Sequence, residues 1–263
     1  MVKNKFKTNK MMDEDTIISN VCELVEKYNF IYLTSDMRGF LYNKLIINYE
    51  DFYVKLFSSL NKMKITSIIP SYTYTNKGNF NIYKTKSKLS LLSKWSLNQK
   101  NIIRSEHPLF SCIGIGKNKK ILKNIGKSAF GRNSIFDKLY YEKSCLLHLG
   151  RPLELGNTSI HYVEQLAGAT YRINKKFKTK VYDKDKYIGS NYTVFVRDFY
   201  KTNDYSTNTT KICKVLKKNK LVKELGNYKD NTNITILDYK KSIDLMINEF
   251  YKNQNIFISK KKI

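Results

Sequence analysis

The sequence lacks an apolar stretch that could span or enter a membrane. No window approaches the roughly 18 uncharged apolar residues that indicate a transmembrane helix. The polar, lysine-rich residues 1–12 lead into three acidic residues at 13–15, whereas a signal peptide needs an apolar stretch after its basic residues. We therefore expect a cytoplasmic protein that binds no membrane, with residues 1–12 flexible.

Cysteine is scarce and widely spaced. Cys22, Cys112, Cys145 and Cys213 form no CxxC pair. Two of them, Cys112 and Cys145, lie within apolar runs, where a small buried thiol is the ordinary role. The sequence therefore predicts neither a disulfide nor a bound metal.

Arginine accounts for only six of the 48 basic residues, although the net charge is +26. A strongly positive surface attracts phosphate without a specific site, but the chain is also rich in asparagine, isoleucine and tyrosine, as AT-rich codons would produce. Proteins that read nucleic acids favour the planar guanidinium group for paired hydrogen bonds. Nucleic acid is therefore disfavoured as a partner, and a non-enzymatic basic protein that binds nucleic acid is kept as an alternative.

Two glycine motifs that suggest nucleotide binding are incomplete. Residues 126–128 (Gly-Lys-Ser) match the end of a phosphate-binding loop, but Ile121 stands where that loop needs its first glycine. Residues 114–116 begin a dinucleotide fingerprint, but Lys119 replaces the third glycine. The sequence thus excludes both nucleotide-binding loops.

Helices and strands alternate along most of the chain, which predicts an α/β protein. At 263 residues with 41% hydrophobic residues, the chain can bury one large core, so we expect one domain over 1–263 with a less regular part at 173–263. The fold expected is a layered α/β/α arrangement around a central, mixed sheet. Helical patterns lie at 13–28, 51–62, 87–97, 118–125, 158–167, 210–223 and 239–252, and strand patterns at 30–35, 65–70, 110–116, 144–150 and 192–199.

Only three histidines can support imidazole chemistry near neutral pH. His148 lies within the apolar run CLLHLG, which favours a structural role. His107 precedes Pro108 in a turn that opens a strand, where a structural and a functional role are equally consistent with the sequence. His161 precedes Glu164 by three residues at a helix start, so both lie on one helical face. This pair is a candidate general base with the carboxylate that orients it.

Four segments around these histidines occur in the same order and at similar spacing as in the aminoglycoside 3-N-acetyltransferase family, which this chain resembles. The segments are RSEHPLFS (104–111), FGRNSIFDKL (130–139), LLHLG (146–150) and NTSIHYVEQ (157–165). Two further stretches agree, YLTSDMRGF (32–40) and IIPSYTYT (68–75). The resemblance covers about residues 15–172 and implies that family's fold.

The resemblance also implies an acetyl-CoA-dependent transfer with site residues in the matched segments. His161 would be the catalytic base and Glu164 its catalytic partner, and the acetyl group would pass directly from acetyl-CoA to the acceptor. Residues implied for coenzyme binding are Thr34, Ser35, Arg38, Thr73, Arg104, His107, Ser111, Phe130, Gly131, Arg132 and Ser134. Residues implied for acceptor binding are Asp36, Tyr72 and Glu164, with 173–263 shaping the acceptor side.

Three arginines, Arg38, Arg104 and Arg132, fall inside the matched segments. In a chain dominated by lysine, an arginine inside a motif suggests forked contacts with the phosphates of the coenzyme. Surface salt bridges are the alternative role.

The charge of the chain also bears on the acceptor. A protein at +26 repels polycationic aminoglycosides, so we expect an anionic acceptor, such as a nucleotide-linked amino sugar or a related glycan precursor. The alternatives are 3-N-acetylation of an aminoglycoside antibiotic, O-transfer, and transfer of a longer acyl chain. A homodimer is left open.

Overall fold

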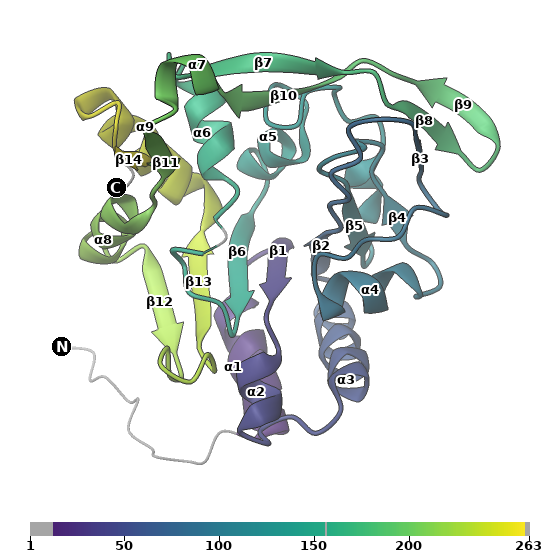
Figure 1. Ribbon diagram of the computed structural model, residues 1–263. Coiled ribbons are helices and arrows are strands. Elements are labelled where there is room, and N and C mark those ends of the chain that lie inside the picture. Colours follow the sequence, from purple (N-terminus) through teal and green to yellow (C-terminus); the bar gives the residue numbers. More distant parts are fainter. Residues whose placement is uncertain (1–12, 156, 261–263) are drawn as a thin grey trace.

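A seven-stranded mixed sheet forms the centre of the protein (Figure 1). The computed structural model describes residues 13–155 and 157–260, so the segment 1–12 that we expected to be flexible lies outside the described residues. The sheet has the order β12-β13-β6-β1-β2-β5-β4. Its strands are β1 (Phe30–Ser35), β2 (Thr66–Pro70), β4 (Ile103–Arg104), β5 (Cys112–Ile115), β6 (Ser144–Leu149), β12 (Val222–Leu225) and β13 (Ile234–Asp238).

The three central strands run parallel and are buried throughout. β1 pairs with both β2 and β6 in parallel, whereas β5 and β13 join the sheet in antiparallel directions. Every residue of β1, β2 and β6 is buried. Parallel strands covered on both faces read as continuous apolar runs, which is why the sequence predicted these three strands. The mixed sheet is confirmed.

Helices cover both faces of the sheet, which confirms the predicted layered architecture. On one face, Ile31 and Leu33 of β1 pack into a core with the first and third helices, and on the other face Phe30 and Tyr32 pack toward the last one. The helices are α1 (Glu14–Val25), α2 (Arg38–Tyr42), α3 (Tyr49–Lys62), α4 (Leu91–Leu97), α5 (Ile135–Tyr140), α6 (Ile160–Leu166), α7 (Phe199–Thr202), α8 (Thr210–Lys218) and α9 (Tyr239–Lys252). Among the described helices, none has the length and apolar character that crossing a bilayer requires.

A long two-stranded arm runs over one end of the sheet, above α5 and α6 (Figure 1). It consists of β7 (Arg172–Phe177) and β10 (Tyr192–Arg197) in antiparallel pairing. Its tip is the hairpin of β8 (Lys180–Asp183) and β9 (Lys186–Gly189), and β8 also pairs with β3 (Asn79–Asn81). A small sheet of β11 (Tyr205–Thr207) and β14 (Ile258–Lys260) completes the C-terminal part.

Some predicted helices are shorter or of another kind. The segment predicted as a helix at 118–125 is a 3-10 turn, η1 (Lys119–Leu122). The helix predicted at 87–97 begins only at Leu91, because Ser90 forms a capping box with Ser93. The basic helix predicted at 210–223 ends at Lys218, and the chain turns at Lys220 with positive φ before the edge strand β12.

Candidate active site

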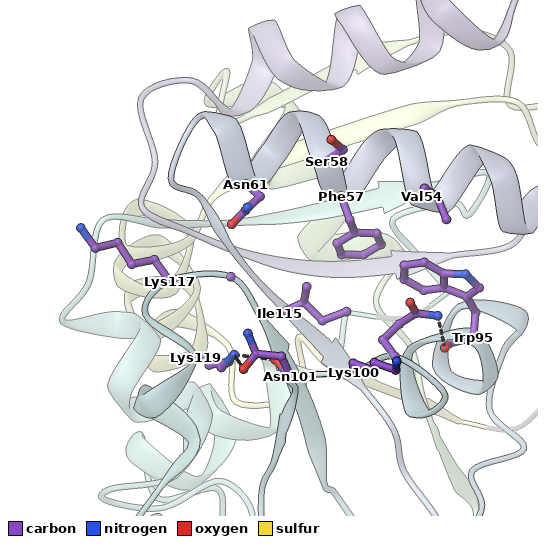
Figure 2. Close-up of a pocket in the computed structure, with 12 residues that line it drawn as sticks. Val54, Phe57, Ser58, Asn61, Trp95, Lys100, Asn101, Ile115, Lys117 and Lys119 are labelled. Atoms are coloured by element: carbon purple, nitrogen blue, oxygen red, sulfur yellow. Dashed lines mark hydrogen bonds between the residues drawn. The ribbon is translucent and has the colours of Figure 1, made fainter.

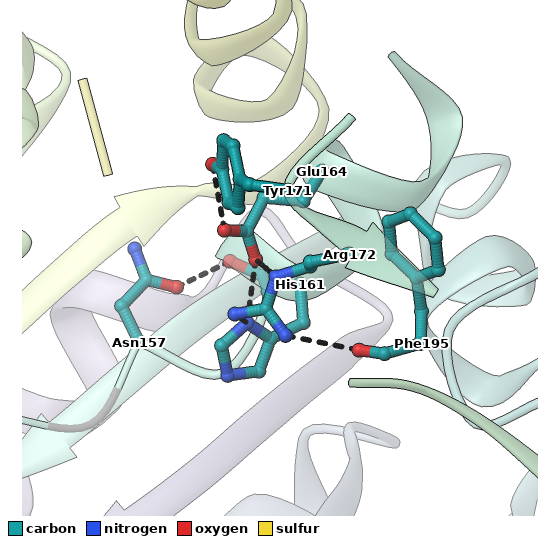
Figure 3. Close-up of polar contacts among 7 residues, drawn as sticks. Asn157, His161, Glu164, Tyr171, Arg172 and Phe195 are labelled. Carbon is teal, nitrogen blue, oxygen red and sulfur yellow. Dashed lines mark hydrogen bonds and ion pairs between the residues drawn. The ribbon is translucent and has the colours of Figure 1, made fainter. Parts of the chain in front are cut away.

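The first turn of α6 carries the predicted catalytic pair (Figure 3). His161 Nδ1 lies 2.7 Å from Glu164 Oε2. The Glu164 side chain is 0% exposed and that of His161 is 23% exposed, so one edge of the imidazole ring reaches solvent while its carboxylate partner does not. The turn before the helix is fixed by the buried Ser159 hydroxyl, which donates to Asn157 Oδ1. The structure thus brings together the two residues that the sequence placed on one helical face.

Two residues that sequence reasoning missed complete this cluster. α6 ends at Leu166, and Gly168 follows its C-cap with a positive φ of 73°, which suits a residue without a side chain. The chain then enters β7 almost at once. Tyr171 then donates from its hydroxyl to Glu164 Oε1 at 2.9 Å. Arg172 places Nε 2.7 Å from Glu164 Oε2 and donates from Nη1 to the Phe195 carbonyl at 2.9 Å. Both oxygens of the buried carboxylate therefore have partners.

The contacts of His161 favour one tautomer of its ring. Its Nδ1 also lies 3.0 Å from Nη2 of Arg172, but a guanidinium can only donate, whereas the Glu164 carboxylate can only accept. The contact with Glu164 is the shorter of the two and involves an ionised carboxylate, which favours the tautomer with the proton on Nδ1. This leaves the lone pair on Nε2, which has no hydrogen-bond partner among the described residues.

The ionisation of this cluster suits a general base. Burial lowers the pKa of His161, the hydrogen bond to Glu164 opposes that effect, and the charge of Arg172 lowers it further. Burial alone would raise the pKa of Glu164, but the hydrogen bonds and charges of His161 and Arg172 outweigh it and lower the pKa. Near neutral pH the carboxylate is ionised and the imidazole is neutral, which is the state that can accept a proton.

Aromatic rings form a wall beside His161. Phe130, one of the residues implied for coenzyme binding, is 1% exposed, and its ring centroid lies 5.2 Å from that of His161. The wall continues through Phe110, 4.8 Å from Phe130, to Tyr74, 5.8 Å from Phe110. Such a wall keeps water away from one side of the imidazole ring.

The loop after β1 forms part of a separate groove of about 400 Å³. Ser35, Asp36 and Arg38 line it, as does Arg151, which sequence reasoning missed. The hydrogen bonds of Arg38 lower the pKa of Asp36 more than burial raises it, and Arg38 Nε lies 2.9 Å from Asp36 Oδ1. The Asp36 carboxylate, predicted to bind the acceptor, is thus paired with Arg38. Burial raises the pKa of Tyr74 and the charge of Arg151 opposes the rise.

Arg104 and His107 lie in the interior instead of facing a ligand site. Each nitrogen of the Arg104 guanidinium donates to oxygens of the chain, including the hydroxyls of Ser71 and Ser111. His107 is 1% exposed, accepts at Nδ1 from two backbone amides and contacts the Thr193 carbonyl through Nε2. Burial lowers the pKa of His107 to about 4. In the structure, Arg104, His107 and Ser111 thus tie loops together within the chain.

Other predicted site residues are also engaged within the chain. Thr34 Oγ1 lies 2.5 Å from Nδ1 of His148, which is fully buried as its apolar surroundings predicted. The Tyr72 hydroxyl lies 2.5 Å from that of Tyr32. Thr73 donates from its hydroxyl to the Pro108 carbonyl. Ser35 is likewise buried, with its hydroxyl 2.8 Å from the hydroxyl of Tyr53.

The segment between β5 and β6 places its predicted residues around a second cavity of about 590 Å³. Gly131 and the exposed Arg132 line this cavity with Phe130. A Cβ at Gly131 would lie 2.7 Å from Ser128 Oγ, so a larger residue there would have to displace the Ser128 and Gln165 side chains. Ser134 has a helix-capping role, because its hydroxyl accepts from the Asp137 amide at 3.2 Å.

No cluster of three or more metal-ligating side chains occurs in the described ranges 13–155 and 157–260. The buried charges of the site are instead matched within the protein, by Glu164 and Arg172.

A family profile and several solved structures resemble the chain. The profile described as aminoglycoside 3-N-acetyltransferase matches residues 63–250. The YokD protein from Bacillus subtilis is 16% identical, with a TM-score of 0.71 over 92% of this chain and 100% of that chain. The apoenzyme of aminoglycoside acetyltransferase AAC(3)-IVa is 16% identical, with a TM-score of 0.69 over 97% and 93%. Sisomicin-bound AAC-VIa is 12% identical, with a TM-score of 0.75 over 91% and 98%.

These structural likenesses show a shared fold. No curated protein sequence matches the chain.

Proposed function

This chain belongs to the aminoglycoside 3-N-acetyltransferase family and is an acetyltransferase, and we propose that it acetylates an amino group of a sugar with His161 as general base. The observation that carries the proposal is the contact of 2.7 Å between His161 Nδ1 and the fully buried Glu164 carboxylate. It leaves Nε2 with a lone pair in a ring that is neutral near neutral pH.

In the proposed reaction, His161 Nε2 takes a proton from the attacking amine. Glu164 holds the proton on Nδ1 and stabilises the imidazolium that forms, while Arg172 keeps Glu164 ionised. Acetyl-CoA supplies the acetyl group as a thioester: the new C–N bond forms, the C–S bond breaks, and coenzyme A leaves as the thiol after taking up the proton held by His161. A well-placed base typically contributes about 10² to 10⁴ in rate.

Direct transfer without an acyl-enzyme is supported by the state of the cysteines. Burial raises the pKa of Cys22, Cys112, Cys145 and Cys213. A thiol with a raised pKa is a poor nucleophile because little thiolate is present at neutral pH.

The chemistry of the groove after β1 fits the phosphates of acetyl-CoA. Arg38 and Arg151 both line it, and forked guanidinium groups bind phosphate well. Arg151 donates from Nε to the Leu155 carbonyl, and its terminal nitrogens have no hydrogen bond among the described residues. We propose that these two arginines hold the phosphates, with Arg132 as a further contact.

For the acceptor, we propose an anionic amino sugar, such as one linked to a nucleotide or another glycan precursor. The net charge of +26 attracts anions. Among the described residues that line the groove, Asp36 is the one carboxylate, and it is paired with Arg38. Asp36, a residue predicted to bind the acceptor, is therefore not a free carboxylate that would attract a polycation.

An aminoglycoside is the second candidate acceptor. The profile that matches this chain is named for aminoglycosides, and the similar folds include sisomicin-bound AAC-VIa and AAC(3)-IVa in complex with a gentamicin or with apramycin. A histidine base would serve a hydroxyl group as well as an amine, so the acceptor panel below includes both.

We further propose that the chain forms one domain and that its C-terminal third shapes the acceptor side. The Phe195 carbonyl in β10 holds Arg172 beside the catalytic pair. The C-terminal helix α9 packs against α5, α6 and β6.

The deciding experiment is titration of acetyl-CoA into wild type and His161→Ala, followed by a thiol-release assay. The panel contains free amino sugars, nucleotide-linked amino sugars, their hydroxyl analogues and kanamycin-type aminoglycosides. We expect both proteins to bind acetyl-CoA and only wild type to release thiol, fastest with nucleotide-linked amines. Faster thiol release with aminoglycosides would show that the acceptor is an aminoglycoside and not an anionic amino sugar. Absence of acetyl-CoA binding by wild type would refute the proposed function.

A further inference from the structure

An open groove of about 520 Å³ lies at the opposite end of the sheet from the loop after β1 (Figure 2). β5 runs antiparallel to β2, so Ile115 at its end pairs with Ser67 near the start of β2. The start of β2 lies beside Phe30, whereas Ser35 is the last residue of β1. The groove is therefore separate from the one that carries Arg38 and Arg151. Its lining residues are Val54, Phe57, Ser58, Asn61, Trp95, Gln99, Lys100, Asn101, Ile115, Gly116, Lys117 and Lys119.

Aromatic and aliphatic side chains form the floor of this groove. The rings of Phe57 and Trp95 stack with centroids 5.0 Å apart and planes 25° apart. Each remains slightly exposed, at 7% and 8%, and Ile115 lies beside them in Figure 2. A flat, apolar ligand group would contact these edges and remove them from water.

Ammonium groups form the opposite side. Lys117 and Lys119 lie across the groove from Trp95 in Figure 2, and Lys100 also lines it. Lys119 Nζ lies 2.5 Å from both the carbonyl and the side-chain oxygen of Asn101, which hold it in place. An ammonium has three donors, so Lys119 keeps one for a ligand.

Carboxylates are absent from the described residues that line the groove. The positive charge of the three lysines is therefore not balanced locally, and an anion placed there meets no repulsion from the lining. Amide groups complete the wall: Gln99 donates from Nε2 to the Trp95 carbonyl at 3.0 Å, which leaves its side-chain oxygen free to accept.

We propose that this groove is a second ligand site, specific for a mononucleotide. The base would lie against Phe57, Trp95 and Ile115 with its amino group near Gln99, and the phosphates would lie between Lys117 and Lys119. The base of such a ligand matches the apolar floor of the groove, and its phosphates match the lysine side. A bare anion or an uncharged nucleoside would match only one of the two. The site is independent of the acetyl transfer proposed at His161.

ADP is the probe, titrated calorimetrically into wild type and a Lys117→Gln/Lys119→Gln double variant. We expect saturable binding of ADP, weaker binding of adenosine and of pyrophosphate, and at least about a tenfold loss of ADP affinity in the double variant, since charge-assisted contacts to phosphate are lost. Ser58→Tyr, which fills the groove without changing the charge, should weaken ADP to a similar extent.

Two control variants separate this site from net charge and from the coenzyme. Lys211→Gln/Lys214→Gln removes the same charge from the exposed side of α8 and should leave ADP affinity unchanged. Arg38→Gln/Arg151→Gln should also retain ADP binding, while the KM for acetyl-CoA should stay unchanged in the Lys117/Lys119 variant. Absence of saturable ADP binding, an equal loss in the α8 control, or a raised KM in the Lys117/Lys119 variant would each overturn the proposal, whatever the outcome of the acetyl-transfer assay.

Discussion

The carboxylate of Glu164 lies 2.7 Å from Nδ1 of His161 and is fully enclosed by protein. The proposed base and its partner come from a single turn of α6. Their environment comes from Arg172, the first residue of the following strand, and from Tyr171 just before it. The effect of each residue can therefore be tested separately.

Removing the base should affect the rate of transfer but not the binding of the coenzyme. His161→Ala should lower kcat by about 10² to 10⁴, because the other two histidines, His107 and His148, are buried and cannot replace it. Steady-state kinetics and acetyl-CoA titration together measure this. A loss of acetyl-CoA affinity equal to the loss of rate would instead indicate a binding role.

Removing the buried charge of Glu164 should lower the stability of the protein as well as the rate of acetyl transfer. Glu164→Gln leaves Arg172, whose side chain is 6% exposed, without its carboxylate. Breaking a buried ion pair in this way typically costs about 3 to 5 kcal/mol. Chemical denaturation should show this loss of stability. The His161→Ala variant should lose much less stability, because the His161 side chain is 23% exposed. Equal stability of Glu164→Gln and wild type would contradict the enclosed ion pair.

The pH dependence of activity should report the electrostatics around His161. A base must be neutral, so kcat/KM should rise with pH through the pKa of His161, at a pH below the ordinary value of about 6.5. Burial and the Arg172 charge both lower that pKa. Arg172→Met should therefore move the rising limb to higher pH, and Arg172→Lys, which keeps a positive charge, should move it less. An identical limb in all three proteins would exclude the effect of Arg172.

Two buried histidines should make the protein sensitive to mild acid. Burial lowers the pKa of both His107 and His148 to about 4, with the charge of Arg151 adding to the effect at His148. Between about pH 6.5 and 4 the unfolded chain binds protons that the folded chain does not, so the free energy of unfolding falls by up to about 1.4 kcal/mol per pH unit for each histidine. Thermal melts across this window should show the decline, and His148→Leu should make it shallower. A stability that is flat from pH 6.5 to 4 would argue against buried neutral rings.

The buried Arg104 should have a structural role, whereas the three arginines that line the two cavities should bind the coenzyme. Arg104→Lys should lower the free energy of unfolding by about 2 to 3 kcal/mol, because a buried network of charged hydrogen bonds is lost, and leave the KM for acetyl-CoA unchanged. Arg38→Lys, Arg132→Lys and Arg151→Lys should raise that KM with little change in stability. Denaturation and kinetics on the four variants test both parts, and an unchanged KM in the last three would remove the phosphate contacts.

The sequence predicted most of the sheet because buried parallel strands leave apolar runs. Strand predictions at 30–35, 65–70 and 144–150 coincide closely with β1, β2 and β6. It did not predict β13, although Ile234, Ile236 and Leu237 are all buried. This strand is inserted from the far end of the chain, antiparallel to β6, and no local pattern shows a pairing between segments so distant in sequence.

The sequence predicted those residues of the candidate site that are close together in the chain. It did not predict those that are brought to the site by tertiary contacts. The interval of three residues between His161 and Glu164 is visible in a helix. Arg172 lies in the next strand, and no local spacing links it to the pair. The only signal for it was that arginine is rare in this chain, which is also what drew attention to Arg104. Whether Arg104 faces inward depends on the pairing of β4 with β5, which the sequence does not show.

The base, its carboxylate, the tyrosine and the arginine all lie in one unit of helix, glycine turn and strand, from α6 to the first residue of β7. Their relative positions depend on that short unit and on a backbone carbonyl at Phe195, which any residue type can provide. Extensive replacement elsewhere on the surface, such as the accumulation of lysine in this chain, can therefore proceed without altering the geometry of the reacting groups. A compact unit of this kind would let the exterior of an enzyme change its charge, and with it the ligands that approach, without moving the residues proposed to transfer the proton.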